Sequence, residues 1–132
     1  MKKGWVYLLI AAAIACNSEA GYKKAEDAQE AAREFIRACL DGNTEKANFY
    51  MFKDSADANT MLLNKWKTDY DKRPNEEKVA LKNANIIVIN SANVNDSTVD
   101  FTFSNSFKNT DTTTIRILRL NKEWLVDLEH LH

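Results

Sequence analysis

The sequence predicts an α+β domain in which N-terminal helices pack on one face of a curved antiparallel sheet of about four strands. Apolar residues recur at helical spacing between residues 28 and 81, whereas they alternate with polar residues beyond residue 83. Helices followed by strands, with no linker or repeat between them, indicate helices segregated to one face of an antiparallel sheet. The chain of 132 residues has room for one such domain.

The first predicted helix spans about residues 28–40 and is defined by one continuous apolar face of alanines and larger side chains. Phe35 is expected to anchor this face in the core. Gly42 follows the last turn and suits the left-handed conformation that ends many helices. Cys39 lies on the same face, and we interpret it as a small buried hydrophobe.

Two or three further helices are expected before the sheet. Asn43 or Thr44 caps a short helix, and a longer one runs from residue 58 to about 70. Pro74 stops the longer helix, and residues 75–81 form another turn or two. The apolar faces predicted for the two helices are Ala47, Tyr50 and Met51, and Ala58, Met61, Leu62, Trp66 and Tyr70.

Four strands are expected after residue 83. Residues 86–89 are β-branched, residues 112–120 form the third strand, and residues 123–128 the return strand. A slip in alternation between Ile117 and Leu118 indicates a bulge or a strand covered on both faces. The side chains predicted to face the helices are Val99, Phe101, Phe103, Trp124 and Val126.

The N-terminus carries the layout of an export signal. Lys2 and Lys3 precede an apolar stretch of about ten residues, which is too short to span the ~30 Å of a bilayer core. The following residues 13–16, Ala-Ile-Ala-Cys, resemble the bacterial lipobox, in which a signal peptidase cuts before an acylated cysteine. The sequence therefore predicts a lipoprotein signal peptide at residues 1–15, with Cys16 as the lipidation site. An ordinary secretory signal with an incidental Cys16 is the alternative.

These boundaries predict three segments and a location. A lipidated tether covers residues 16–23, and the folded domain covers residues 24–132. Asn17 stands where an aspartate would signal retention in the inner membrane of some bacteria. We therefore expect a lipid-anchored protein of the cell envelope, at the outer membrane, with the membrane as a partner through its acyl chains.

Several short stretches resemble the NTF2-like (cystatin-like) superfamily, and within it the small DUF4878-type lipoproteins. They are residues 32–36, 40–43, 95–98 and 120–127, together with Trp66 and Tyr70. Lys122-Glu123 stands where the family has lysine-glycine, which leaves the type of the last hairpin turn open. The resemblance implies a cone-shaped fold with a pocket between helices and sheet, and it implies no agreed activity.

Charge and motif content exclude several functions. After loss of the signal with Lys2 and Lys3, the mature chain holds 16 basic and 19 acidic side chains, so we expect no nucleic-acid partner. No phosphate-binding glycine loop, paired-cysteine motif or nucleophile elbow is present, and no cofactor is expected. His130 and His132 are two imidazoles without a third ligand, so no metal site is expected.

Enzymes of the NTF2-like fold place an acid and a tyrosine inside the cone, and the candidates here are Asp100, Asp127, Tyr50 and Tyr70. Asp100 alternates with the apolar face of its strand, so we expect it to face outward and pair with Arg116. No catalytic residue is therefore assigned. The aromatic side chains at helical spacing, Tyr50, Trp66 and Tyr70, are candidates for a pocket wall.

Three functions remain open from the sequence. The first is a non-enzymatic envelope lipoprotein whose domain binds a small apolar ligand or a protein partner. The second is an isomerase or hydratase that uses the cone, and the third is a structural subunit of an envelope complex, including a homodimer through the sheet. A lined, uncharged cavity favours the first, a buried acid near a tyrosine the second, and a filled cone the third.

Overall fold

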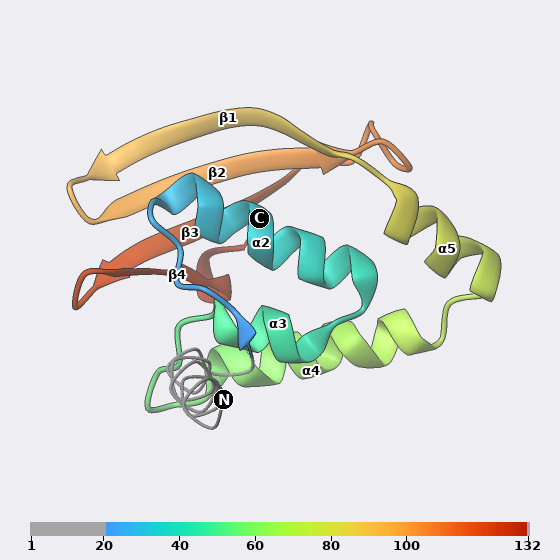
Figure 1. Ribbon diagram of the computed structural model, residues 1–132, viewed down its shortest axis with the longest axis horizontal. Helices are drawn as coiled ribbons and strands as arrows, with labels where there is room; N and C mark the ends of the chain where they lie inside the picture. The colour runs from blue at the N-terminus through green and yellow to red at the C-terminus, as the bar shows by residue number, and fades with distance from the viewer. Residues whose placement is uncertain (1–20, 132) are drawn as a thin grey trace, which may run out of the picture.

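The computed structural model describes residues 21–131, in which helices pack on one face of a four-stranded antiparallel sheet (Figure 1). The predicted α+β architecture is confirmed. The predicted signal peptide, Cys16 and His132 lie outside the described residues. The elements are α2 (Ala28–Asp41), α3 (Thr44–Phe49), α4 (Ala58–Asp71), α5 (Asn75–Asn83), β1 (Ile86–Asn95), β2 (Thr98–Asn105), β3 (Thr113–Leu120), β4 (Glu123–Asp127) and the 3₁₀ helix η2 (Leu128–His130).

Helix α2 lies across the sheet and contacts all four strands. Asp27 caps its start by accepting a hydrogen bond from the backbone N–H of Glu30 at 2.7 Å. Gly42 ends it with φ 73°, as predicted, and the Asn43 backbone N–H donates to the carbonyl oxygen of Ala38 at 2.8 Å. Phe35 is buried with the alanines of this face, so its predicted place in the core is confirmed.

The predicted apolar face of α4 is confirmed at Trp66 and Tyr70, which contribute to the core, and is wrong at Met61 and Leu62. Met61 is 68% exposed and Leu62 is also exposed, whereas the buried residues of α4 are Asn59, Leu63 and Tyr70. These three residues are spaced four and seven positions apart and lie on one face of the helix. This face is rotated away from the predicted one. The rotation is set by Asn59, a polar residue that sequence periodicity does not assign to a core.

Asn59 is fully buried because it joins α4 to the end of the sheet. Its side-chain amide donates to Asp127 Oδ1 at 3.0 Å, and its carbonyl oxygen accepts from the backbone N–H of Leu128. Asp127 is itself buried and also accepts from the backbone N–H of Glu129 at 3.1 Å. The polar groups in this contact satisfy one another, which lets them lie in the core.

The strands pair in sequence order, β1-β2-β3-β4. Val99 and Phe101 of β2 are buried toward the helices, and Asp100 faces outward and pairs with Arg116 at 2.8 Å, as predicted. Phe103 and Trp124 are partly buried against the same core and Val126 is fully buried, also as predicted.

One detail of the sheet, the position of its bulges, differs from the prediction. Another, the type of the last hairpin turn, was left open by the sequence. The register between β2, β3 and β4 is continuous, so no bulge occurs at Ile117 and Leu118; the irregularities lie in β1. At the last hairpin, Asn121 and Lys122 have φ of 51° and 66°. Positive φ at both positions is the pattern of a type I′ turn.

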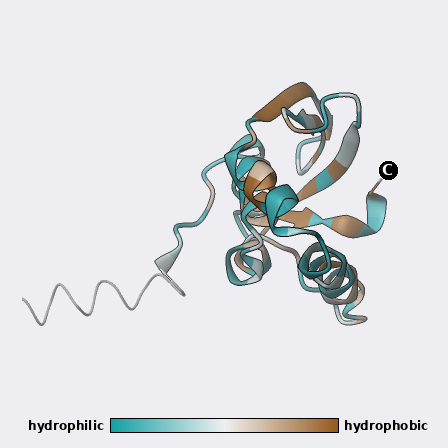
Figure 2. Ribbon diagram, turned by 90° about the vertical axis from the view of Figure 1, so that its right-hand side faces the viewer, coloured by the Kyte–Doolittle hydropathy of each residue, from teal (hydrophilic) through white to brown (hydrophobic). Residues whose placement is uncertain are grey.

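The two edges of the sheet differ. The backbone of residues 50–52 covers β4, since Phe52 N–H donates to the Val126 carbonyl and Val126 N–H donates to the Tyr50 carbonyl, both at 2.8 Å. At the opposite edge, β1 has no neighbouring strand among the described residues. The start of β1, at the top of both views, is one of the hydrophobic stretches coloured brown in Figure 2.

Within residues 21–131, no helix combines the length and the apolar character that crossing a membrane requires.

Candidate functional site: a pocket between helices and sheet

A pocket of about 630 Å³ lies between α2, α4 and the inner face of the sheet, with η2 closing one side. Most of its wall is apolar and comes from elements far apart in the sequence. The main apolar contributors are Phe35 and Leu40 from α2, Leu63 and Trp66 from α4, Phe103 and Ile115 from the strands, and Leu128 from η2. This volume lies within the range of small-molecule sites in proteins.

Trp66 and Tyr70 form the aromatic part of the wall. Their ring centroids lie 5.0 Å apart with planes tilted by 36°. The Tyr70 hydroxyl donates to the Leu40 carbonyl oxygen at 3.3 Å, which fixes the ring between α4 and the end of α2. Burial raises the pKa of Tyr70 above its usual value, with Asp41 and Asp71 adding to the shift and Lys67 opposing it.

Tyr50, the third aromatic candidate, does not line this pocket. Its side chain is buried near α3, where its hydroxyl donates to the Lys23 carbonyl oxygen at 2.6 Å. Burial raises its pKa, and the carboxylates of Glu34 and Glu30 raise it further. Tyr50 therefore holds the segment before α2 in place, while Trp66 and Tyr70 share one wall.

Cys39 also lines the pocket, on the same face of α2 as Phe35. The surrounding side chains remove water from the thiol, and this burial raises its pKa to about 12. The thiol therefore keeps its proton at neutral pH, and a protonated thiol is a poor nucleophile. This agrees with its interpretation as a small apolar residue of the helix face.

The charged side chains of the pocket stand at its rim. Lys65 pairs with Asp69 at 3.6 Å, and both are exposed. Arg73 pairs with Glu77, and Lys108 and Asp111 come from the loop between β2 and β3. The carboxylates that line the pocket, Asp69 and Asp111, are thus solvated rather than held beside a tyrosine in its interior.

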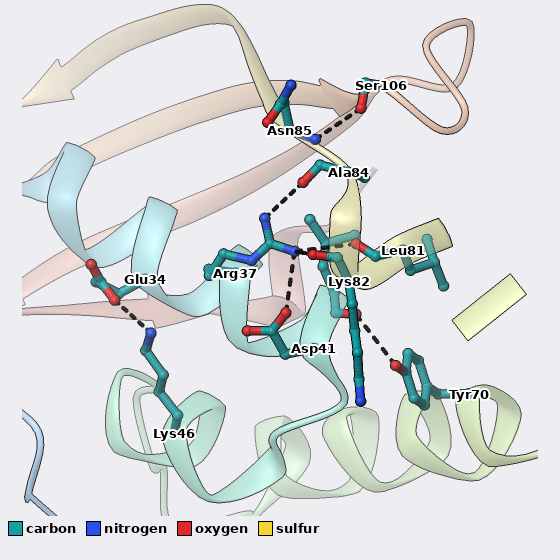
Figure 3. A network of polar contacts seen from close by, with 11 residues as sticks. Glu34, Arg37, Asp41, Lys46, Tyr70, Leu81, Lys82, Ala84, Asn85 and Ser106 are labelled. Carbon is teal, nitrogen blue, oxygen red and sulfur yellow. Dashed lines mark hydrogen bonds and ion pairs between the residues drawn. The ribbon is translucent and has the colours of Figure 1, made fainter. Parts of the chain in front are cut away.

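A polar network ties α2 to α5 beside the site (Figure 3). The Arg37 guanidinium donates to the carbonyl oxygens of Leu81, Lys82 and Ala84, at 3.1, 3.0 and 2.7 Å. It also pairs with Asp41 at 3.2 Å. A single cation therefore binds three carbonyl oxygens at the end of α5, and the Leu81 carbonyl also accepts the Ala84 backbone N–H at 3.1 Å.

The remaining candidates lie elsewhere. Asp100 is on the outer face of the sheet, and Asp127 is bonded to Asn59. His130 Nε2 lies 3.8 Å from Asp127 Oδ2. In residues 21–131, no group of three or more histidine, cysteine or carboxylate side chains could hold a metal ion.

Sequence reasoning found two of the aromatic wall residues and missed the contributors from loops and the C-terminal end. Lys108 and Leu131 line the pocket from segments without helical or strand periodicity. Leu128 was expected to continue β4, but Asp127 starts the 3₁₀ turn that directs Leu128 inward. Alternation along the return strand did place Leu128 on the same face as Trp124 and Val126, whereas no pattern in the sequence marks Lys108 or Leu131.

One solved structure similar to this chain is an NTF-2 like protein of unknown function from Shewanella oneidensis MR-1. The two agree with a TM-score of 0.52 at 11% sequence identity, over 73% of this chain and 88% of that protein. No family model matches the sequence. No curated protein matches it either. The domain therefore has an NTF2-like fold, and fold alone assigns no function.

Proposed function

We propose that this chain is an envelope lipoprotein of the DUF4878 type, anchored through Cys16, whose NTF2-like domain binds a small apolar ligand. The observation that carries the binding proposal is the pocket of about 630 Å³ with its mostly apolar wall. An apolar cavity with a few polar groups at its mouth is the usual form of a small-molecule site. Its rim of Lys65, Arg73 and Lys108 suits a ligand with one polar end directed to solvent.

Binding is preferred over isomerase or hydratase chemistry. A general base of raised pKa needs burial or a like charge beside it. The carboxylates of this pocket are exposed at the rim, and Asp100 pairs with Arg116 on the other side of the sheet. The lipid anchor supports a role that keeps the pocket at a membrane surface rather than one that releases a product in bulk.

Filling the pocket is expected to abolish ligand binding. The probe is 1-anilinonaphthalene-8-sulfonate, titrated into the soluble domain (residues 21–132) and followed by its fluorescence. Cys39→Trp places a large ring into the cavity beside Phe35, so the Kd should rise at least about tenfold, or 1.4 kcal/mol.

The matched control is Val79→Trp, which adds the same ring on the exposed side of α5 and should leave the Kd unchanged. Circular dichroism spectra establish that both variants are folded. Equal binding by Cys39→Trp and the wild type would contradict the pocket as the site. No measurable binding by the wild-type domain would contradict the proposal itself.

Lipidation is expected at Cys16 and not at Cys39. Radiolabelled palmitate should enter the full chain in a bacterial host, and Cys16→Ser should remove the label, because the thiol is the atom that is acylated. Cys39→Ser is the control and should keep full labelling, since Cys39 lies in the pocket wall of the folded domain. Labelling that persists in Cys16→Ser would contradict the proposed lipid anchor.

A further inference from the structure

The open edge of the sheet is the feature that neither the fold nor the pocket explains. β1 is ten residues long, and it contains no charged residue and no proline. Ile87 is 38% exposed and Val88 is 47% exposed, although both are β-branched and apolar. Soluble proteins usually block a strand edge of this length with charges, proline or a covering segment.

The backbone N–H and C=O groups at the start of β1 are oriented so that a further strand could pair with them. The Ser106 N–H donates to the Asn85 carbonyl oxygen at 3.0 Å, and Ile86 lies opposite Asn105 in the register. In an antiparallel ladder, residues alternate in the direction of their backbone groups. Asn85 and Ile87 therefore face β2, while the N–H and C=O groups of Ile86 and Val88 face the open edge.

The sequence of this segment complements itself. With a two-fold axis at Ile87, each Ile87 lies opposite the Ile87 of another copy, and Ile86 lies opposite Val88. Pairs of β-branched residues stabilise antiparallel strands, and an uncharged strand brings no like charges together. The bulge after Val88 limits the regular ladder to residues 86–88, which are the residues that this axis pairs.

The opposite edge explains why such pairing would stop at two copies. The backbone of residues 50–52 already occupies β4 through the hydrogen bonds to Val126. Within residues 21–131, the β1 edge is the one left free in each copy, so the pairing is isologous and closed. Two copies would form one eight-stranded sheet whose outer edges are both covered.

We propose that the domain forms a two-fold homodimer through antiparallel pairing of β1 with β1 of a second copy, centred on Ile87. The proposal differs from a dimer through the outer face of the sheet, where Asp100 and Arg116 lie. It is independent of the ligand proposal, because β1 contributes no residue to the pocket wall.

The decisive variant is Ile87→Lys, tested in the domain (residues 21–132) by analytical ultracentrifugation over a range of concentrations. Ile87 is 38% exposed and does not belong to the buried core, so the change leaves the core intact. The wild type should be dimeric, and Ile87→Lys should raise the dimer Kd at least about tenfold by placing like charges in register. Val94→Lys, with the same charge far from the axis, is the control and should remain dimeric.

Two further measurements keep the result unambiguous. Val88→Pro removes an N–H that faces the open edge, so it should give a folded monomer. Mixing Ile87→Lys with Ile87→Glu should restore a mixed dimer, because opposite charges then lie opposite each other. A wild type that stays monomeric up to about 1 mM overturns the proposal. So does a dimer that resists Ile87→Lys, since that result places the interface on another surface.

Discussion

Asn59→Asp is expected to destabilise the domain by about 3–5 kcal/mol at pH 7, the cost of an uncompensated buried charge. The variant has nearly the same shape, but an oxygen replaces the amide nitrogen that lies 3.0 Å from Asp127 Oδ1. Two carboxylates then face each other in a site with little water. Urea unfolding followed by circular dichroism measures the loss, which is a large part of the 5–15 kcal/mol that typically stabilises a domain.

The pH dependence of this loss identifies its cause. In the folded variant, the carboxylate pair favours keeping one proton, so the pKa of one of the two groups rises above its unfolded value of about 3.9. The folded state then binds more protons than the unfolded state, so its stability relative to the wild type recovers as pH falls from 7 toward about 5. A loss that stays constant over this range would indicate a packing defect instead.

Gly42→Ala is expected to cost nearly as much, for two separate reasons. Gly42 has φ 73°, a conformation that costs other residues about 1–2 kcal/mol. A β-carbon at this position would also lie 2.5 Å from Cε1 of Tyr70, and relieving such a clash costs about 1–3 kcal/mol. The Tyr70 ring cannot move away freely, because it is buried and its hydroxyl is bonded to Leu40. Urea unfolding again gives the magnitude.

A double-mutant cycle separates the two causes. Tyr70→Leu removes the ring atoms that the new β-carbon meets, so Gly42→Ala should cost only its backbone term in that background. Gly42→Asn gives the complementary comparison, because asparagine tolerates positive φ but still places a β-carbon against the ring. If Gly42→Ala costs the same with and without Tyr70, the clash plays no part.

The sequence predicted those parts of the fold in which one periodic face meets the core. The alanine-rich face of α2 and the alternation of Val99 and Phe101 were predicted correctly, because burial of apolar surface alone orients them. The outward position of Asp100 followed from the same register and is confirmed by its pair with Arg116. Trp66 and Tyr70 were identified as wall residues from their spacing on one helix.

The orientation of α4 could not be predicted, because a buried polar contact sets it. Asn59 enters the core only through its bonds to Asp127 and Leu128, which lie nearly seventy positions later in the chain. Periodicity counts apolar residues, so it favoured Met61 and Leu62, which are exposed. The rim of the pocket was missed for a related reason, since Lys108 and Leu131 reach it from irregular segments.

The pairing of residues 50–52 with β4 affects how the domain folds. The helices are synthesised first, yet Met51 finds its partner only when Val126 exists, and α2 also needs the late strands β3 and β4. Contacts between residues so far apart form slowly, because a long loop must close before they stabilise anything. The helical half therefore leaves the ribosome before its apolar faces can be buried. For a chain with the export signal proposed at residues 1–15, such a delay would favour transport across a membrane in the unfolded state.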